Sequence, residues 1–108
     1  GLAHPKLARA LTALHETPGA TWSLESMAGV AGMSRSAFAA AFRQHLGQTP
    51  AEYLVCWRMS IAQTLLRRGA SVKTVSDELG YASASSLSRA FAQTLGVSPR
   101  AWLKRQPA

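Results

Sequence analysis

The side chains best suited to bind a ligand are arginines and serines. They recur at helical spacing in two stretches, residues 34–43 and 83–89. Arginine forms bidentate hydrogen bonds with phosphates and with the edge of guanine, and serine makes weaker contacts with either. Nine of the twelve basic residues are arginine, and with only five acidic residues the formal net charge is +7. A positive excess of this size favours a polyanionic partner, and nucleic acid is the first candidate.

Residues that support catalysis or metal binding are few and scattered. His4, His15 and His45 lie far apart in the sequence and form no zinc-protease motif, and no glycine-rich phosphate loop is present. The single cysteine, Cys56, excludes an internal disulfide and a cysteine-based zinc site. Its place beside Trp57 in an apolar helical stripe predicts a buried, unreactive thiol. We therefore expect no enzymatic activity, no metal and no cofactor.

Membrane association is not expected either. No apolar run approaches the roughly 18 to 20 residues that a membrane-spanning helix needs, and the first residues lack the charged and apolar regions of a signal peptide. The chain begins with Gly1 in place of an initiator methionine. We expect it to be an excised piece of a longer protein.

The spacing of apolar residues predicts an all-α fold. Leu7, Leu11 and Leu14 follow one another at four and three residues, which places them on one face of a helix over residues 5–16. Every later segment also has helical periodicity, and glycine and proline occur only between segments. A chain of 108 residues is sufficient for a single domain.

An internal repeat organises most of this domain. The stretch from Ser23 matches the stretch from Ser71 with an offset of 48 residues, which becomes 49 after Gly32 and Gly80. The matching positions are mainly apolar, glycine, proline and helix-capping residues, whereas few polar positions match. The two repeats therefore share an architecture and present different side chains to the outside.

Each repeat is expected to form a short helix, a glycine turn and a longer helix, which is the outline of a helix-turn-helix motif. Serines cap both helices and a glycine makes the turn; these residues are Ser23, Gly32 and Ser34 in the first repeat and Ser71, Gly80 and Ser83 in the second. The inward positions of the longer helices are Phe38, Phe42 and Leu46 in the first repeat and Leu87, Phe91 and Leu95 in the second.

One long helix is expected between the repeats. Thr49-Pro50-Ala51-Glu52 is a capping box with proline at the first helical position, and the helix runs to about Arg68. Its length of roughly 27 Å would allow two helix-turn-helix motifs to reach successive major grooves, which lie about 34 Å apart. The expected subdomains are 5–48 and 69–106, joined by a linker helix over 49–68 whose inward stripe is Leu54, Trp57, Ile61 and Leu65, with Ala62 beside it.

Taken together, these features resemble the DNA-binding domain of AraC/XylS-type bacterial transcription regulators. The resemblance covers about Pro5 to Arg105 and rests on the doubled motif and on several short stretches. These are Trp22-Ser23-Leu24-Glu25, Gly32-Met33-Ser34-Arg35-Ser36, Arg58-Met59 with Ala62 and Leu65-Leu66, Gly80-Tyr81, Ser88-Arg89-Ala90-Phe91 and Gly96-Val97-Ser98-Pro99.

The resemblance implies sequence-specific binding of double-stranded DNA by about seven helices in two subdomains. It also implies a bacterial, cytoplasmic regulator that carries an effector-sensing or dimerisation domain outside this chain. Contact with RNA polymerase is a further implication, since many family members make it.

The residues expected to contact DNA lie near the starts of the longer helices, where outward side chains reach base edges. We expect base contacts from Arg35, Ser36, Ala39, Ala40, Ser85, Ser86, Ser88 and Arg89, and the resemblance places family base-contact positions at Ser36, Ala39, Ala40, Ser85 and Arg89. We expect phosphate contacts from Ser34, Arg43, Lys73, Ser83, Arg100 and Lys104.

Alanine gives the first repeat an unusual recognition surface. Ala39 and Ala40 cannot hydrogen-bond to a base and can only touch a thymine methyl group, so this repeat is expected to read few bases by hydrogen bond. A simpler interpretation is that alanines favour helix on an uninvolved face. In the second repeat, Arg89 is the strongest candidate for reading guanine, and its alternative is an ion pair with Asp77 or Glu78.

Two other functions remain open at this point. A helical module that docks on RNA polymerase or another regulator is the main alternative, and the sparsely decorated alanine helix favours it. RNA binding is less consistent with the sequence, because Trp22, Trp57 and Trp102 all fall at apolar helix positions and leave no stacking surface. Arg58 is expected to have a structural role, in which it binds a carbonyl or carboxylate between the subdomains. Arg67 and Arg68 are expected to be favourable positive charges at the C-terminus of their helix.

Overall fold

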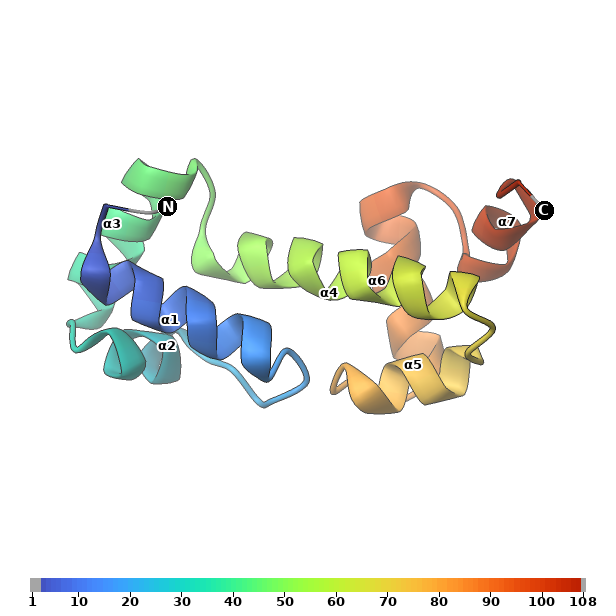
Figure 1. Ribbon diagram of the computed structural model, residues 1–108, viewed down its shortest axis with the longest axis horizontal. Coiled ribbons are helices and arrows are strands. Elements are labelled where there is room, and N and C mark those ends of the chain that lie inside the picture. Colours follow the sequence, from blue (N-terminus) through green and yellow to red (C-terminus); the bar gives the residue numbers. More distant parts are fainter. Residues whose placement is uncertain (1–2, 108) are drawn as a thin grey trace. The chain divides into compact units, whose positions relative to one another are not determined.

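The computed structural model describes residues 3–107, and over this range the chain forms seven α-helices and no β-strand (Figure 1). The helices are α1 (Pro5–Glu16), α2 (Leu24–Ala31), α3 (Arg35–Leu46), α4 (Pro50–Arg67), α5 (Val72–Glu78), α6 (Ala84–Leu95) and α7 (Pro99–Lys104). The all-α prediction is confirmed, and the helix ends agree with the expected ones to within a residue or so.

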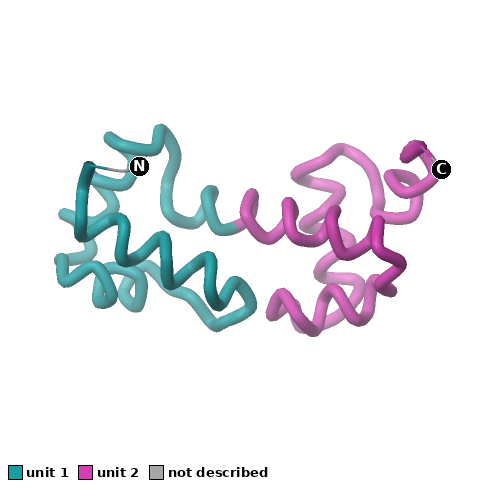
Figure 2. Tube along the Cα trace, viewed as in Figure 1, with its two compact units in different colours: residues 1–54 teal, residues 55–108 magenta. Residues whose placement is uncertain are grey.

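The helices divide into two compact units, residues 1–54 and 55–108 (Figure 2). The first unit contains α1, α2, α3 and the start of α4, and the second contains the rest of α4 with α5, α6 and α7. Each unit has a hydrophobic core of its own. Each therefore holds one of the two expected helix-turn-helix motifs.

The core of the first unit fixes which face of α3 is buried. Phe38 and Phe42 are fully buried, and their rings lie 5.5 Å apart. They pack in one cluster with Leu7, Ala10 and Leu14 of α1, Met27, Ala28 and Ala31 of α2, and Leu54 of α4. Since the two phenylalanines follow one another at four residues, the opposite face of α3 is left outside the core.

The core of the second unit fixes which face of α6 is buried. Leu87 and Phe91 are fully buried, and the ring of Trp102 in α7 meets the ring of Phe91 edge-on at 5.7 Å. They cluster with Met59, Ala62 and Leu66 of α4 and with Val75 and Leu79 of α5. The expected inward residues Leu46 and Leu95 are only half-buried and pack against the edges of the two cores.

Serine caps and glycine turns form the two motifs as expected. Ser23, Ser34, Ser71 and Ser83 each accept a hydrogen bond from the backbone N–H three residues later, at the start of α2, α3, α5 and α6. Between the helices of each motif a glycine takes a left-handed conformation, with φ of +70° at Gly32 and +79° at Gly80. A side chain at either position would be strained, which explains glycine there.

The stripe expected on α4 is only partly right. Leu54 and Ala62 are buried as expected, whereas Trp57, Ile61 and Leu65 are only half-buried. The remaining buried residues of this helix in the second core are Met59 and Leu66, which the expected stripe did not include. The expected stripe continued the face of Leu54 by steps of three or four residues, but the second core packs against a neighbouring face of the helix. The prediction of a buried thiol fails for the same reason, because Cys56 lies away from both sets of core residues and is exposed.

Candidate nucleic-acid interface

The first helix-turn-helix motif consists of α2, the Gly32 turn and α3. Inside the turn, the N–H of Met33 donates to the carbonyl of Ala28 at 3.0 Å. The guanidinium of Arg9 on α1 donates to the carbonyl of Ala31 at 3.5 Å. These bonds engage carbonyls in the last turn of α2 and hold the turn against α1.

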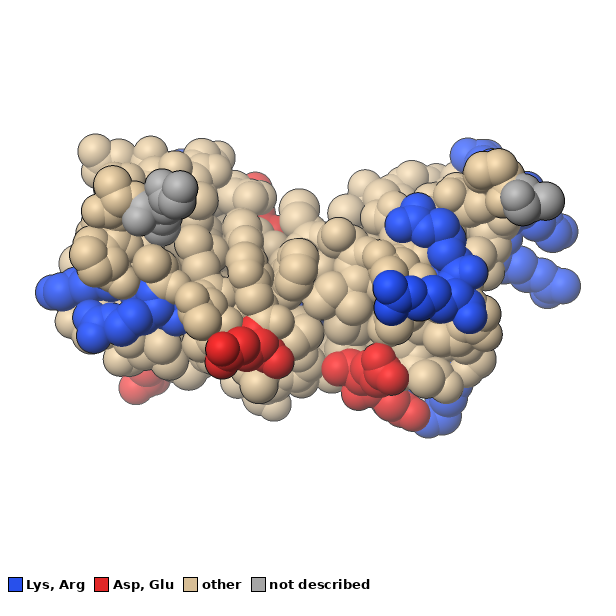
Figure 3. Space-filling model, in the orientation of Figure 1, with Lys and Arg blue, Asp and Glu red and all other residues tan. Residues whose placement is uncertain are grey.

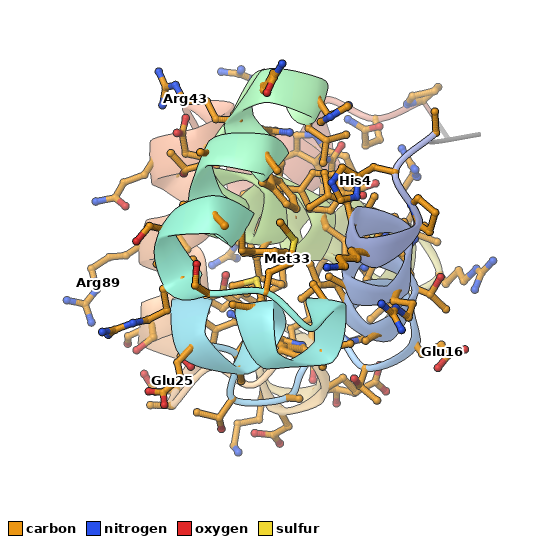
Figure 4. All side chains as sticks on the ribbon, turned by 90° about the vertical axis from the view of Figure 1, so that its left-hand side faces the viewer. His4, Glu16, Glu25, Met33, Arg43 and Arg89 are labelled. Atoms are coloured by element: carbon orange, nitrogen blue, oxygen red, sulfur yellow. The ribbon has the colours of Figure 1, made fainter. Side chains whose placement is uncertain are left out.

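The outward face of α3 carries the expected contact residues. Ser36, Ala40 and Arg43 are exposed and Ala39 is half-buried, and Arg35 is exposed as the first residue of the helix. Figure 4 shows Arg43 pointing outward on the side of this unit away from Glu16. The Oγ of Ser34 accepts the N–H of Ala37 at 3.2 Å, and the remaining N–H groups of this first turn can bind an anion.

The second motif consists of α5, the Gly80 turn and α6. Ser85 and Arg89 are exposed, and Ser86 and Ser88 are half-buried. Ser86 contributes to the cap as well, because its N–H donates to Ser83 Oγ at 3.1 Å and the two hydroxyls lie 3.1 Å apart. Its availability for a base contact is therefore lower than the sequence suggests.

Arg89 is free to bind a ligand. Lys73 of α5 forms an exposed ion pair with Asp77 at 3.2 Å, which occupies one of the acids considered for Arg89. Within residues 3–107, Arg89 makes no ion pair with any acidic side chain. Because Asp77 partly neutralises the charge of Lys73, Lys73 is less suited to bind a phosphate than the other residues expected to do so. Those residues (Ser34, Arg43, Ser83, Arg100 and Lys104) are all exposed.

Basic residues are not confined to the motifs. The face of the molecule seen in Figure 3 carries both basic and acidic side chains in each unit. Arg67, on the last turn of α4, places its guanidinium 5.5 Å from the centre of the Trp102 ring. It therefore packs on an aromatic ring in addition to its expected position at a helix C-terminus.

Arg58 takes a similar position in the second unit. Its guanidinium lies 5.7 Å from the centre of the Tyr81 ring, and Tyr81 directly follows the turn glycine Gly80. Burial raises the pKa of Tyr81, and the nearby charge and hydrogen bond of Arg58 partly oppose that rise. The structural role expected for Arg58 thus includes an aromatic partner in its own unit, which the sequence did not indicate.

The histidines are less scattered in space than in the sequence. The rings of His4 and His45 meet edge-on at 5.3 Å, and His15 Nε2 lies 2.6 Å from the hydroxyl of Tyr53. In the described part of the chain, no three His, Cys, Asp or Glu side chains come together in a way that could hold a metal ion.

Over the same residues, none of the helices has the length and apolar character that a membrane span needs.

The sequence did not indicate a pocket that lies between the first motif and the start of α4. Leu24, Met27, Ala39, Ala40, Arg43, Thr49, Pro50 and Ala51 line an open pocket of about 440 Å³ beside α3. Leu24 is 39% exposed, although leucine is usually buried. Leu24 is the first residue of α2 and lies off its inward face, and this position could have predicted an exposed apolar side chain from the sequence.

Similarity to known proteins agrees with this arrangement. The helix-turn-helix domain family matches residues 27–105. A putative AraC-like transcription regulator of Streptomyces lividans is 44% identical over 100 residues, which cover 92% of this chain and 33% of that protein. The RCS-specific transcriptional activator RclR of Escherichia coli K12 is 38% identical over 105 residues, 96% of this chain and 37% of its own. The chain thus spans about a third of the length of these relatives.

Solved structures give the same result. The DNA-binding domain of AdpA, a global transcriptional factor in complex with a target DNA, superposes with a TM-score of 0.83 at 33% identity, covering 90% of this chain and 88% of that one. An AraC-type regulator from Chromobacterium violaceum superposes with a TM-score of 0.82 at 25% identity and covers 96% of both chains. On this evidence the chain belongs to the AraC-type family of helix-turn-helix transcription regulators.

Proposed function

We propose that this chain is the sequence-specific, double-stranded-DNA-binding part of a bacterial transcription regulator. The observation that carries the proposal is the pair of helix-turn-helix motifs, each with a recognition helix anchored by a buried phenylalanine, Phe42 or Phe91. The anchors leave the opposite, polar or basic faces of α3 and α6 exposed. Membership of the AraC-type family and the likeness to a domain bound to its target DNA support it.

The two recognition helices would read bases in different ways. Arg89 is the main specificity residue, since a free arginine on the outward face of α6 can form a bidentate pair with guanine O6 and N7. Ser85 and Ser88 make weaker contacts beside it, and Ser86 contributes mainly to the cap. On α3, Arg35 and Ser36 supply the hydrogen-bonding groups, and Ala39 and Ala40 supply apolar contact.

Phosphate contacts would fix the position of each helix on the duplex. The capped helix starts at Ser34 and Ser83 offer backbone N–H groups and the positive end of a helix dipole. Arg43, Arg100 and Lys104 add exposed charges, with Lys73 in a lesser role. Such contacts supply affinity and carry no sequence information.

Support for further parts of the regulator comes from the relatives, of which this chain spans about a third. An effector-sensing or dimerisation domain outside this chain would control DNA binding, and RNA polymerase would be the partner at the promoter. The site of action would be the bacterial cytoplasm, and no enzymatic activity is assigned to the domain. The alternative of a protein-docking module is less favoured, because it leaves the free Arg89 and the basic charge without a role.

Selection of bound sequences from a random duplex library tests the proposal. We expect one or two half-sites to emerge, with two half-sites separated by about one helical turn. Titration of the selected duplex at several salt concentrations should give a log–log slope near −5 for about six phosphate contacts. Failure to enrich any sequence, together with affinity that does not depend on salt, would favour the protein-docking alternative.

A further inference from the structure

The pocket beside α3 is almost entirely apolar. Seven of its eight lining residues carry no charge, and Arg43 is the exception. The one other polar residue, Thr49, is engaged in the capping box of α4, where its Oγ accepts the N–H of Glu52 at 3.1 Å. In return, the carboxylate of Glu52 accepts the N–H of Thr49 at 3.2 Å. The pocket therefore offers apolar contact and one cationic edge.

The position of the pocket on α3 indicates what it meets. Ala40 and Arg43 are exposed and lie away from the buried Phe38 and Phe42, and the half-buried Ala39 lies on the flank between the two faces. In a helix-turn-helix protein the exposed face, near the helix start, is turned to the floor of the major groove. Leu24 and Met27 extend the apolar surface from α3 onto α2. The pocket thus forms part of the surface that the proposed function turns toward the bases.

The major groove presents few apolar groups. Among the four unmodified bases, only thymine exposes one there, the methyl group on C5, and alanine side chains are suited to contact it. A methyl group on C5 of cytosine occupies the same place on the pyrimidine ring. An apolar pocket open to the groove therefore distinguishes a pyrimidine with a C5-methyl group from one without it. Such a pocket does not distinguish thymine from 5-methylcytosine, because it offers no hydrogen bond to the rest of the base.

We propose that the pocket of Leu24, Ala39 and Ala40 reads C5-methyl groups of pyrimidines, with Arg43 on a neighbouring phosphate. The inference rests on the proposed DNA-binding function and adds a specificity rule to it. The first motif recognises methyl groups, whereas the second recognises a guanine edge through Arg89. It follows that methylation of cytosine in the operator can substitute for thymine at the positions that this pocket covers.

Charges around the pocket are consistent with a phosphate at its edge. Arg43 is exposed and points outward (Figure 4). Glu52 follows the lining residue Ala51, and its carboxylate accepts the backbone N–H of Thr49 and is only weakly attracted to Arg43. Glu25 follows the lining residue Leu24 in the first turn of α2, is exposed, and would repel a nearby phosphate. Its replacement by glutamine should strengthen binding to all sequences equally, without changing the preference for methyl groups.

Base analogues test the proposal directly. In the selected operator, each thymine is replaced in turn by deoxyuridine, which removes only the C5-methyl group, and the Kd is measured at constant salt. At the positions that the pocket covers, we expect about fourfold weaker binding per methyl group, the value for burying one carbon. Replacing a covered T·A pair by C·G and then by 5-methylcytosine·G should recover about the same factor on methylation.

Two protein variants assign the effect to the pocket. Leu24→Ala removes one wall and should reduce the thymine-to-uracil ratio toward one. Val30→Ala is the matched control, because Val30 lies on the same helix, is 41% exposed and does not line the pocket. It should leave the ratio unchanged. Circular dichroism of both variants verifies that the helices are retained.

The outcomes separate this inference from the proposed function. Tight, sequence-specific binding with no thymine-to-uracil difference at any position would overturn the methyl-reading role and leave DNA binding intact. A difference that Leu24→Ala does not reduce would also overturn it, since the methyl group would then lie elsewhere. Absence of DNA binding by the unaltered chain would overturn the proposed function and this inference with it.

Discussion

The guanidinium of Arg58 on α4 lies 5.7 Å from the centre of the Tyr81 ring, in the turn between α5 and α6. This pairing links the turn of the second motif to the long helix, 23 positions earlier in the sequence. Tyr81 is also held from within its motif, because its N–H donates to the carbonyl of Ser76 at 2.9 Å. The start of α6 is therefore fixed from two directions.

Removal of the guanidinium should weaken this unit. Arg58→Ala is expected to lower the free energy of unfolding by about 1–2 kcal/mol, the upper range for a partly desolvated cation–π contact. Urea denaturation followed by tryptophan fluorescence provides the measurement. Tyr81→Phe keeps the ring face and should cost less than Tyr81→Leu, which removes the aromatic ring. Equal losses in these two variants would show that the loss comes from the hydroxyl group, which both lack, and that the ring face contributes nothing.

Acid should weaken the cap of α4. The hydrogen bonds from Thr49 lower the pKa of Glu52, so this carboxyl loses its proton more readily in the folded chain than in the unfolded chain. Its contribution to stability is therefore complete above the ordinary carboxyl pKa of about 4.3 and is lost as the pH falls through the lower, folded-state value. Glu52→Gln keeps a capping side chain that does not titrate.

The measurement for Glu52 is the urea midpoint at a series of pH values from about 6 to 3. The loss of stability with acid should be shallower in Glu52→Gln than in the unaltered chain. Glu16→Gln serves as the control, because Glu16 is the last residue of α1 and takes no part in the capping box of Thr49 and Glu52. Parallel pH profiles for all three proteins would contradict this role of the capping box.

Local signals in the sequence were sufficient to predict most of the fold. Serine caps such as Ser34 and turn glycines such as Gly32 act within a few residues, so their patterns predict where helices begin and end. Phe38 and Phe42 were predicted to be buried by their spacing alone, and this defined the outward face of α3 correctly.

Features that depend on packing at a distance were not predicted. The sequence gives no sign that the second core contacts a different face of α4 from Leu54, so Met59 was missed and Cys56 was wrongly expected to be buried. The contact between Arg58 and Tyr81 has the same origin, because spacing along a helix does not indicate which loop lies against it. Which of the outward residues touch DNA stays a prediction.

A longer side chain on α3 should change which bases are read. Ala40→Gln places a side-chain amide on the exposed face, and glutamine pairs with adenine N6 and N7. We expect a new preference for adenine at one position, worth about 1–3 kcal/mol, when bound sequences are selected again. Ser60→Gln, at an exposed position of α4, should select the original operator. An unchanged operator for Ala40→Gln would place this helix away from the bases.

Substitution of Arg89 tests most directly whether this residue contributes to sequence-specific binding or only to general affinity for DNA. Arg89→Ala should cost about 1–3 kcal/mol on the selected operator and relax the preference at one G·C pair. Affinity for random DNA should fall much less, because the guanine edge is lost and most phosphate contacts remain. Competition binding against both duplexes at constant salt measures the difference. Arg68→Ala removes the same charge from the exposed end of α4 and should leave the preference intact. Equal weakening on both duplexes would reduce Arg89 to an electrostatic contact, since a residue that reads a base must distinguish one sequence from another.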